Sequence, residues 1–143
     1  MLYSKILVAF DGSELGNKAL ETAIALAAGN HEIELNVVHA LEYHPVVTEY
    51  TTYSIVDDME LINKAGEKII KTAQDRLSSI PNRSNTMMVE GRADQVIIDQ
   101  AKKLQSDLIV IGSRGLSGIK ELFLGSVSHY ICQHAHIPVL VVK

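Results

Sequence analysis

The sequence contains one cysteine, Cys132, so no disulfide can form within the chain. A chain of 143 residues can bury a core without disulfide or metal cross-links. The scarcity of cysteine fits a reducing compartment, and we expect a cytoplasmic protein. The opening stretch "MLYSKILVAF" lacks a separate charged region and a small-residue cleavage site, which predicts a strand rather than a secretion signal.

Long apolar runs and clustered positive charge are also lacking. No stretch approaches the roughly 18–20 uninterrupted apolar residues that cross a bilayer, so we expect no membrane association. The formal net charge is −4 and the basic residues are scattered, which argues against a nucleic-acid partner. Nine glycines and three prolines make only 12 of 143 residues, a composition typical of a folded protein. We expect one domain over 1–143.

Short apolar runs alternate with segments of helical period. The runs, which predict strands, cover 5–10, 33–40, 85–89, 107–112 and 139–142. Helices are predicted from just after Ser13, an N-cap candidate, to the stop at Gly29, over about 55–79 and 93–104, and from 126 to the turn before Pro138. Such alternation predicts an α/β fold: a doubly wound, five-stranded parallel sheet with helices on both faces, of the Rossmann-like type.

Ligands of doubly wound sheets bind at the carboxyl ends of the strands, where the strand order reverses. The turns after the first and fourth strands are therefore the candidate site. The first is "FDGSE", in which Asp11 ends the strand. A carboxylate there can accept hydrogen bonds from ribose hydroxyls, whereas the alternative is that "DGS" only forms a turn and caps the next helix.

The second turn, "GSRGLSGIKELFLGSVS", begins at Gly112 and leads into a helix near Ser126. A helix N-terminus offers unpaired N–H groups and a positive dipole end. Gly112 and Gly115 remove side chains where a phosphate approaches, Arg114 adds charge, and Ser126 and Ser128 add hydroxyls. The turn therefore predicts a phosphate cradle, unless it is a simple link. The chain lacks both a P-loop and a G-x-G-x-x-G dinucleotide motif.

The spacing of the last glycines is specific. Gly112 and Gly115, then nine residues, then Gly125 and Ser126 form the pattern G-x2-G-x9-G-[ST]. This pattern resembles the ATP-binding branch of the universal stress protein family. The likeness extends to "KILVAFDGSELGNKAL", "VVHALE", "GRADQVIIDQAKKLQSDLIVIGSRG" and "IPVLVVK", so it spans the chain apart from 43–54. It implies a fold of the adenine nucleotide α-hydrolase type and a stress-response regulatory module that binds ATP with Mg²⁺ or Mn²⁺.

The resemblance also implies roles for individual positions. Asp11 would hold the ribose, and Ala9, where some relatives have proline, would lie near the nucleoside. Backbone groups of Ala40 would meet the adenine edge beside Val38, and Gly112 would approach the ribose and the α-phosphate. Phosphate contacts would come from Gly115, Gly125, Ser126 and Val127, with Arg114 as a further candidate.

Cleavage of ATP needs a base that positions the attacking water, and usually a metal held by a carboxylate. The acid nearest to the glycine turn is Glu121, and Asp11 is assigned to the ribose. We therefore expect no catalytic residues, and binding rather than rapid hydrolysis. One alternative is an adenylating enzyme of the same fold, but its signatures S-G-G-x-D and H-x-G-H are missing. Another is a dimeric scaffold without nucleotide, which the intact glycine pattern disfavours.

Three further expectations concern other parts of the chain. The apolar strand Val139–Val142 would lie at a sheet edge, and relatives that resemble this chain pair that strand, so we expect a homodimer. His129 and His134 are five residues apart, which does not stack them on one helix face, and we expect no metal site. Cys132 and Met88 are expected to be packed in the core. The segment 43–54 is either a cover over the nucleotide or a tolerated insertion.

Overall fold

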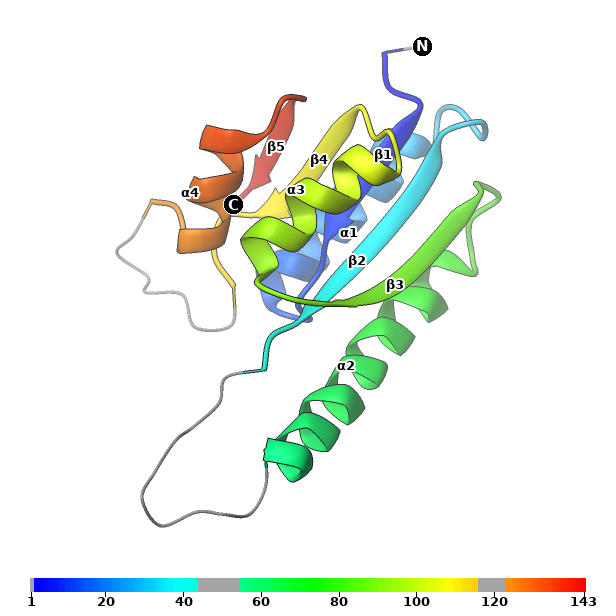
Figure 1. Cartoon of the computed structure of the whole chain (residues 1–143). Helices are drawn as coiled ribbons and strands as arrows, with labels where there is room; N and C mark the ends of the chain where they lie inside the picture. Colours follow the sequence, from blue (N-terminus) through cyan, green and yellow to red (C-terminus); the bar gives the residue numbers. More distant parts are fainter. Residues whose placement is uncertain (1, 44–54, 116–122) are drawn as a thin grey trace.

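The computed structural model describes residues 2–43, 55–115 and 123–143 of the chain (Figure 1). Five strands alternate with four helices in this part of the chain, as the sequence predicts. The elements are β1 (Lys5–Ala9), α1 (Glu14–Ala27), β2 (Glu34–Leu41), α2 (Ile55–Leu77), β3 (Ser84–Glu90), α3 (Ala93–Lys103), β4 (Leu108–Gly112), α4 (Ser126–His134) and β5 (Val139–Val142).

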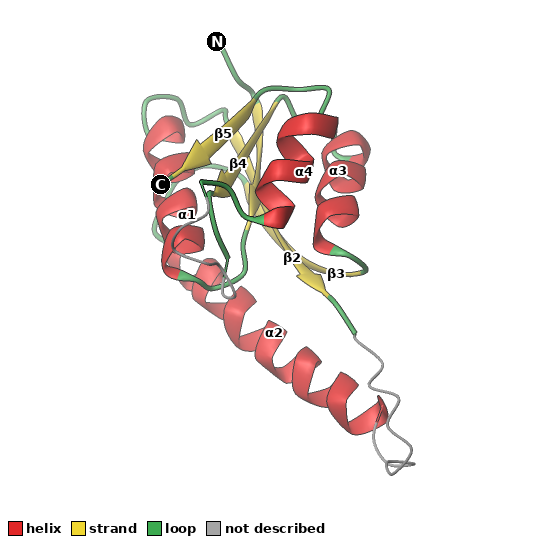
Figure 2. Ribbon diagram, turned by 90° about the vertical axis from the view of Figure 1, so that its left-hand side faces the viewer, coloured by secondary structure: helices red, strands yellow, loops and turns green. Residues whose placement is uncertain are grey.

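The strands form one sheet in the order β3-β2-β1-β4-β5, and all neighbouring pairs are parallel. The chain therefore starts in the middle of the sheet, adds strands on one side, and then crosses to the other side of β1. Helices α1 and α2 cover one face, whereas α3 and α4 cover the other (Figure 2). The prediction of a doubly wound parallel sheet is confirmed, and the strand order reverses between β1 and β4.

Each face of the sheet has its own core. Ile6 and Val8 of β1 are fully buried and pack against α1 and α2, whereas Leu7 packs in the layer under α3 and α4. Because both faces are covered, strand residues of either parity must be apolar. This is why the sequence shows continuous apolar runs rather than alternation.

Two of the helices that start at the carboxyl edge of the sheet, the edge at which the parallel strands end, have a side chain bonded to their first turn. Ser13 caps α1, since its hydroxyl oxygen accepts the N–H of Gly16 at 3.0 Å, as the sequence predicts. At the start of α3 the carboxylate of Glu42, from the segment after β2, accepts the N–H of Ala93. A negative charge at a helix N-terminus is favourable, so Glu42 fixes where α3 begins.

The opposite, amino edge of the sheet is held by Asp107. Its carboxylate accepts the N–H of Ser4 at 2.8 Å, the hydroxyl of Ser4 at 2.7 Å and the N–H of Lys5 at 3.0 Å. Partial burial raises the pKa of Asp107, but these hydrogen bonds outweigh it and hold the pKa below its ordinary value. Asp107 thereby ties the start of β1 to the start of β4.

Two sequence expectations about packing are wrong. Cys132 is exposed, because it lies on the face of α4 that points away from the sheet. Met88 is 37% exposed, because β3 is an edge strand and its side chain lies beside α2 near Gly66. Most of the segment 43–54 lies outside the described residues. Among the described helices, none is both long and apolar enough to cross a membrane.

Candidate functional site

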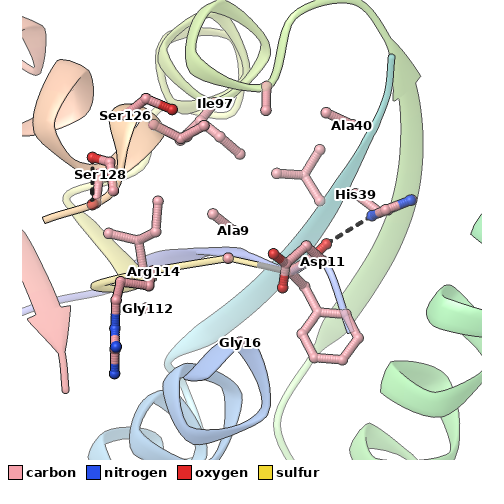
Figure 3. A pocket seen from close by; sticks show the side chains of 17 residues that line it. Ala9, Asp11, Gly16, His39, Ala40, Ile97, Gly112, Arg114, Ser126 and Ser128 are labelled. Carbon is pink, nitrogen blue, oxygen red and sulfur yellow. Dashed lines mark hydrogen bonds between the residues drawn. The ribbon is translucent and has the colours of Figure 1, made fainter. Parts of the chain in front are cut away.

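A cavity of about 360 Å³ opens at the carboxyl edge, where the strand order reverses (Figure 3). Its volume lies within the usual range of small-molecule sites, roughly 300–1,000 Å³. All the residues that the sequence predicts for the site line this one cavity: Ala9, Asp11, Val38, Ala40, Gly112, Arg114, Gly115, Gly125, Ser126, Val127 and Ser128. The structure thus brings together segments more than 100 residues apart, and the role of each residue in binding stays a prediction.

Sequence reasoning missed part of the wall. The further lining residues are Phe10, Gly16, His39, Ala93, Ile97 and Ile111. Ala93 and Ile97 are four residues apart on α3 and share one helix face, whereas the sequence pattern predicts only that they lie in a helix. The signal that could have found them is the position of Ala93 at the first residue of a helix whose start must lie at the carboxyl edge.

The start of α4 forms one end of the cavity. Its N-cap is Gly125, whose own N–H donates to the carbonyl of Ser113 at 2.6 Å. The next three N–H groups, those of Ser126, Val127 and Ser128, belong to the first helical turn, where no intrahelical acceptor exists. These N–H groups, together with the positive end of the helix dipole, make this wall suitable for an anion.

Ser128 has a structural task in this wall. It is only 2% exposed, and its hydroxyl makes hydrogen bonds to the carbonyl oxygens of Ser113 at 2.9 Å and Gly125 at 3.1 Å. The hydroxyl therefore joins the turn after β4 to the start of α4, and a contact of Ser128 with a ligand stays a prediction. In Figure 3 the side chain of Arg114 runs away from Ser126 and Ser128.

One glycine of the site, Gly112, is required by the packing of the protein. A Cβ on Gly112 would lie 2.9 Å from the backbone of Leu15, so the end of β4 can approach α1 only without a side chain. A Cβ on Gly115 would lie 2.6 Å from Oδ2 of Asp11. From the sequence, the missing side chains at Gly112 and Gly115 are explained by the approach of a phosphate alone. The structure shows that Gly112 is needed for contact between β4 and α1.

Asp11 stands where the turns after β1 and β4 meet. Its Oδ1 accepts the N–H of Ser13 at 2.9 Å, which is the turn geometry that "DGS" favours. The carboxylate also lines the cavity, so the turn role and a ligand role are compatible. Beside it, Nδ1 of His39 is 2.9 Å from the carbonyl oxygen of Phe10, which places the ring proton on Nδ1 (Figure 3). This bond ties the end of β2 to the turn after β1.

The cavity is chemically divided. Val38, Ala40, Ile97 and Ile111 supply apolar wall, while the N-terminal turn of α4 supplies N–H donors and Asp11 supplies a carboxylate. Such a site suits a ligand with a flat apolar part, hydroxyl groups and an anionic end. In the described parts of the chain, no group of three or more histidine, cysteine or acidic side chains could hold a metal ion.

Comparison with known proteins gives a consistent result. The sequence is 35% identical to the universal stress protein YxiE of Bacillus subtilis, over 99% of this chain and 100% of that protein. The structure is similar to that of universal stress protein UspA from Lactobacillus plantarum, with a TM-score of 0.88, 21% identity, and coverage of 100% of this chain and 99% of that chain. A universal stress protein family structure from Arabidopsis thaliana with AMP bound has a TM-score of 0.71 and 21% identity, and covers 98% of this chain and 91% of that chain. The sequence pattern of the universal stress protein family matches residues 2–143, and the chain belongs to this family.

Proposed function

We propose that the protein binds ATP in the carboxyl-edge cavity and acts as a stress-response regulatory module of the ATP-binding branch of its family. The observation that carries the proposal is the first turn of α4, whose N–H groups open onto the same cavity as the Asp11 carboxylate. An anion site and a hydroxyl acceptor at one cavity match the two polar parts of a nucleotide. The pattern from Gly112 to Ser126 supports the same assignment.

The walls suggest how the nucleotide lies. We place the adenine against Val38 and Ile97, with its edge at the backbone of Ala40, because this part of the cavity is apolar. The ribose then lies near Ala9 and Asp11. The phosphates extend to Gly115 and to the start of α4, where Gly125, Ser126 and Val127 form the cradle.

The ATP is proposed to carry Mg²⁺ or Mn²⁺ on its phosphates. Mg²⁺ keeps several waters and is usually bound through substrate phosphates together with one or two carboxylates. The ion would neutralise part of the negative charge of the phosphates, so the N–H groups of α4 would have less charge to stabilise. The AMP-bound relative from Arabidopsis thaliana supports the proposal only at the level of the fold, at 21% identity.

We further propose that the protein binds ATP and hydrolyses it slowly, if at all. One oxygen of Asp11 accepts the N–H of Ser13, and the carboxylate is assigned to the ribose rather than to an attacking water. A nucleotide held without rapid turnover suits a regulatory protein of the cytoplasm. The scaffold alternative, which binds no nucleotide, is an outcome of the experiment below.

A homodimer through β5 is also proposed. β5 is the last strand in the sheet order, beside β4, and its four apolar residues Val139–Val142 are all partly exposed. Pairing across a two-fold axis would cover this edge. Light scattering after size exclusion should show a dimer, and Val141→Lys should shift it toward monomer. A monomeric wild type at tens of micromolar would contradict this part of the proposal.

Two variants of Ser126 test the nucleotide site. Ser126 is the first residue of α4, a position where proline fits, and the N-cap Gly125 has φ −69° and ψ 169°, which suits the residue before proline. Ser126→Pro therefore removes one N–H donor while keeping the helix. Ser126→Ala removes only the hydroxyl and is the matched control.

Titration calorimetry with Mg·ATP should show binding by the wild type, and affinity should fall roughly 10- to 100-fold in Ser126→Pro, since hydrogen bonds to charged groups contribute about 1.5–3 kcal/mol. Ser126→Ala should retain most of the affinity. Absence of heat at millimolar ATP, with no nucleotide in the purified protein, would favour the scaffold. Equal affinity in wild type and Ser126→Pro would show that the phosphates lie elsewhere.

A further inference from the structure

The carboxylate of Asp11 lies between two glycines that come from different turns. A Cβ on Gly16, in the first turn of α1, would lie 2.7 Å from Oδ1 of Asp11. A Cβ on Gly115, in the turn after β4, would lie 2.6 Å from Oδ2. Both distances are too short for a Cβ contact, so neither position can carry a side chain while the carboxylate keeps its place. All three residues line the carboxyl-edge cavity (Figure 3).

Glycine is an unfavourable residue at position 16. Gly16 is buried within α1, and its N–H donates to Oγ of Ser13 at 3.0 Å as part of the helix cap. Alanine stabilises a helical position better than glycine does, because glycine loses more backbone freedom on folding. The closest atom to an added Cβ is Oδ1 of Asp11, and the next is Oγ of Ser13 at 3.1 Å, a contact that a shift of a few tenths of an ångström relieves. The Asp11 carboxylate is therefore what requires glycine here.

Asp11 is restricted on several sides. Its Oδ1 accepts the N–H of Ser13 at 2.9 Å, and the two glycines allow the carboxylate to lie close to the backbone of both turns. A carboxylate has about four acceptor positions, so the bond to Ser13 is compatible with further bonds to the hydroxyls of a ligand. A side chain already held in its binding orientation loses little freedom when the ligand arrives, which favours affinity.

We propose that Gly16 and Gly115 are positioning residues, which fix the Asp11 carboxylate so that the site selects nucleotides with free ribose hydroxyls. This inference rests on the proposed binding of ATP with its ribose near Asp11. Gly115 also has a proposed role beside the phosphates, so Gly16 is the position that isolates the effect on Asp11. Alanine at position 16 displaces Oδ1 from Ser13 and from the ribose, and leaves the start of α4 unchanged.

The test compares ATP with 2′,3′-dideoxy-ATP, both as Mg²⁺ complexes, by titration calorimetry. The wild type should bind dideoxy-ATP at least tenfold more weakly than ATP, because hydrogen bonds to a charged group are lost. Gly16→Ala should bind ATP about tenfold more weakly than the wild type does, and dideoxy-ATP within twofold of the wild type. The retained binding of dideoxy-ATP also shows that this variant folds. Gly29→Ala, whose Cβ meets nothing within 4 Å, should leave both affinities unchanged.

The outcomes separate this inference from the proposed function. No binding of ATP by the wild type would overturn both. Binding of ATP by the wild type and by Gly16→Ala with equal affinity would overturn the positioning role alone. An equal loss of affinity for ATP and dideoxy-ATP in Gly16→Ala would also overturn it, since the damage would then not concern the ribose hydroxyls.

A double-mutant cycle shows whether Gly16 acts through Asp11. Asp11→Ala should lower the affinity for ATP at least tenfold, and adding Gly16→Ala should then change it by less than twofold, because no carboxylate remains to be displaced. A further tenfold loss in the double variant would show that the alanine at position 16 blocks the nucleotide directly, which would overturn the positioning role.

Discussion

The carboxyl and amino edges of the sheet each hold an aspartate that accepts backbone N–H groups, yet the two residues differ in surroundings. Asp107, at the amino edge, accepts three hydrogen bonds from Ser4 and Lys5 and joins the starts of β1 and β4. Asp11, at the carboxyl edge, accepts the N–H of Ser13 and also lines the large cavity. Residue type alone therefore does not distinguish a carboxylate that only stabilises the fold from one that also lines a cavity; the position in the topology does.

The largest expected effect is on the free energy of unfolding, and it tests whether Gly112 at the carboxyl edge is needed for packing as well as for binding. Gly112→Ala should lower the free energy of unfolding by about 2–3 kcal/mol, because the added Cβ would lie 2.9 Å from the backbone of Leu15, which cannot move as a flexible side chain can. Urea unfolding measures this. Gly29→Ala is the control, since a Cβ there meets nothing within 4 Å, and it should change stability by less than 0.5 kcal/mol, a roughly neutral surface change. Equal free energies of unfolding for Gly112→Ala and Gly29→Ala would contradict a packing role for Gly112 and leave only its proposed role in ligand binding.

The second prediction concerns Asp107. Asp107→Asn should cost about 1–2 kcal/mol at neutral pH, since it removes a charged acceptor and turns an NH₂ group toward an N–H donor. The folded pKa lies below the ordinary 3.8, so the carboxylate stabilises the fold above that pH, and this contribution is lost as pH falls through the folded pKa. The difference between wild type and variant should therefore shrink below about pH 4. A difference independent of pH would contradict the charge-based account.

The matched change at the carboxyl edge is Asp11→Asn. An asparagine oxygen can still accept the N–H of Ser13, so we expect little loss of stability. Affinity for Mg·ATP should fall about tenfold, roughly 1.4 kcal/mol, because the amide is a weaker acceptor for ribose hydroxyls. Calorimetry and urea unfolding on the same preparations measure both quantities. If Asp11→Asn loses stability but keeps its affinity for Mg·ATP, Asp11 serves to stabilise the fold, as Asp107 does, and not to bind ATP.

Sequence patterns predict the two edges unequally well. The apolar runs, the Ser13 cap and the reversal of strand order were predictable because local periodicity and topology rules determine them. The same rules gather the turns at Asp11 and Gly112 into one cavity. The contact of Gly112 with Leu15, the hydroxyl of Ser128 turned to Ser113 and the clamp of Asp107 were not predictable, since each depends on a tertiary approach between distant segments. The exposure of Cys132 depends on which helix face meets the sheet, and a short helix leaves that face ambiguous in sequence.

The smallest expected effect probes the amino edge. Gln105 lies at φ 54°, a conformation that costs a residue with a side chain about 1 kcal/mol relative to glycine. Gln105→Gly should therefore raise the free energy of unfolding by about 0.5–1 kcal/mol, part of the gain being offset by the more flexible unfolded chain. Gln105→Ala keeps the strain and should bring no gain. If Gln105→Gly and Gln105→Ala have the same free energy of unfolding in urea, the backbone of Gln105 is not strained. A gain specific to glycine would show that this edge, unlike the glycine-rich carboxyl edge, retains a side chain at a cost in stability.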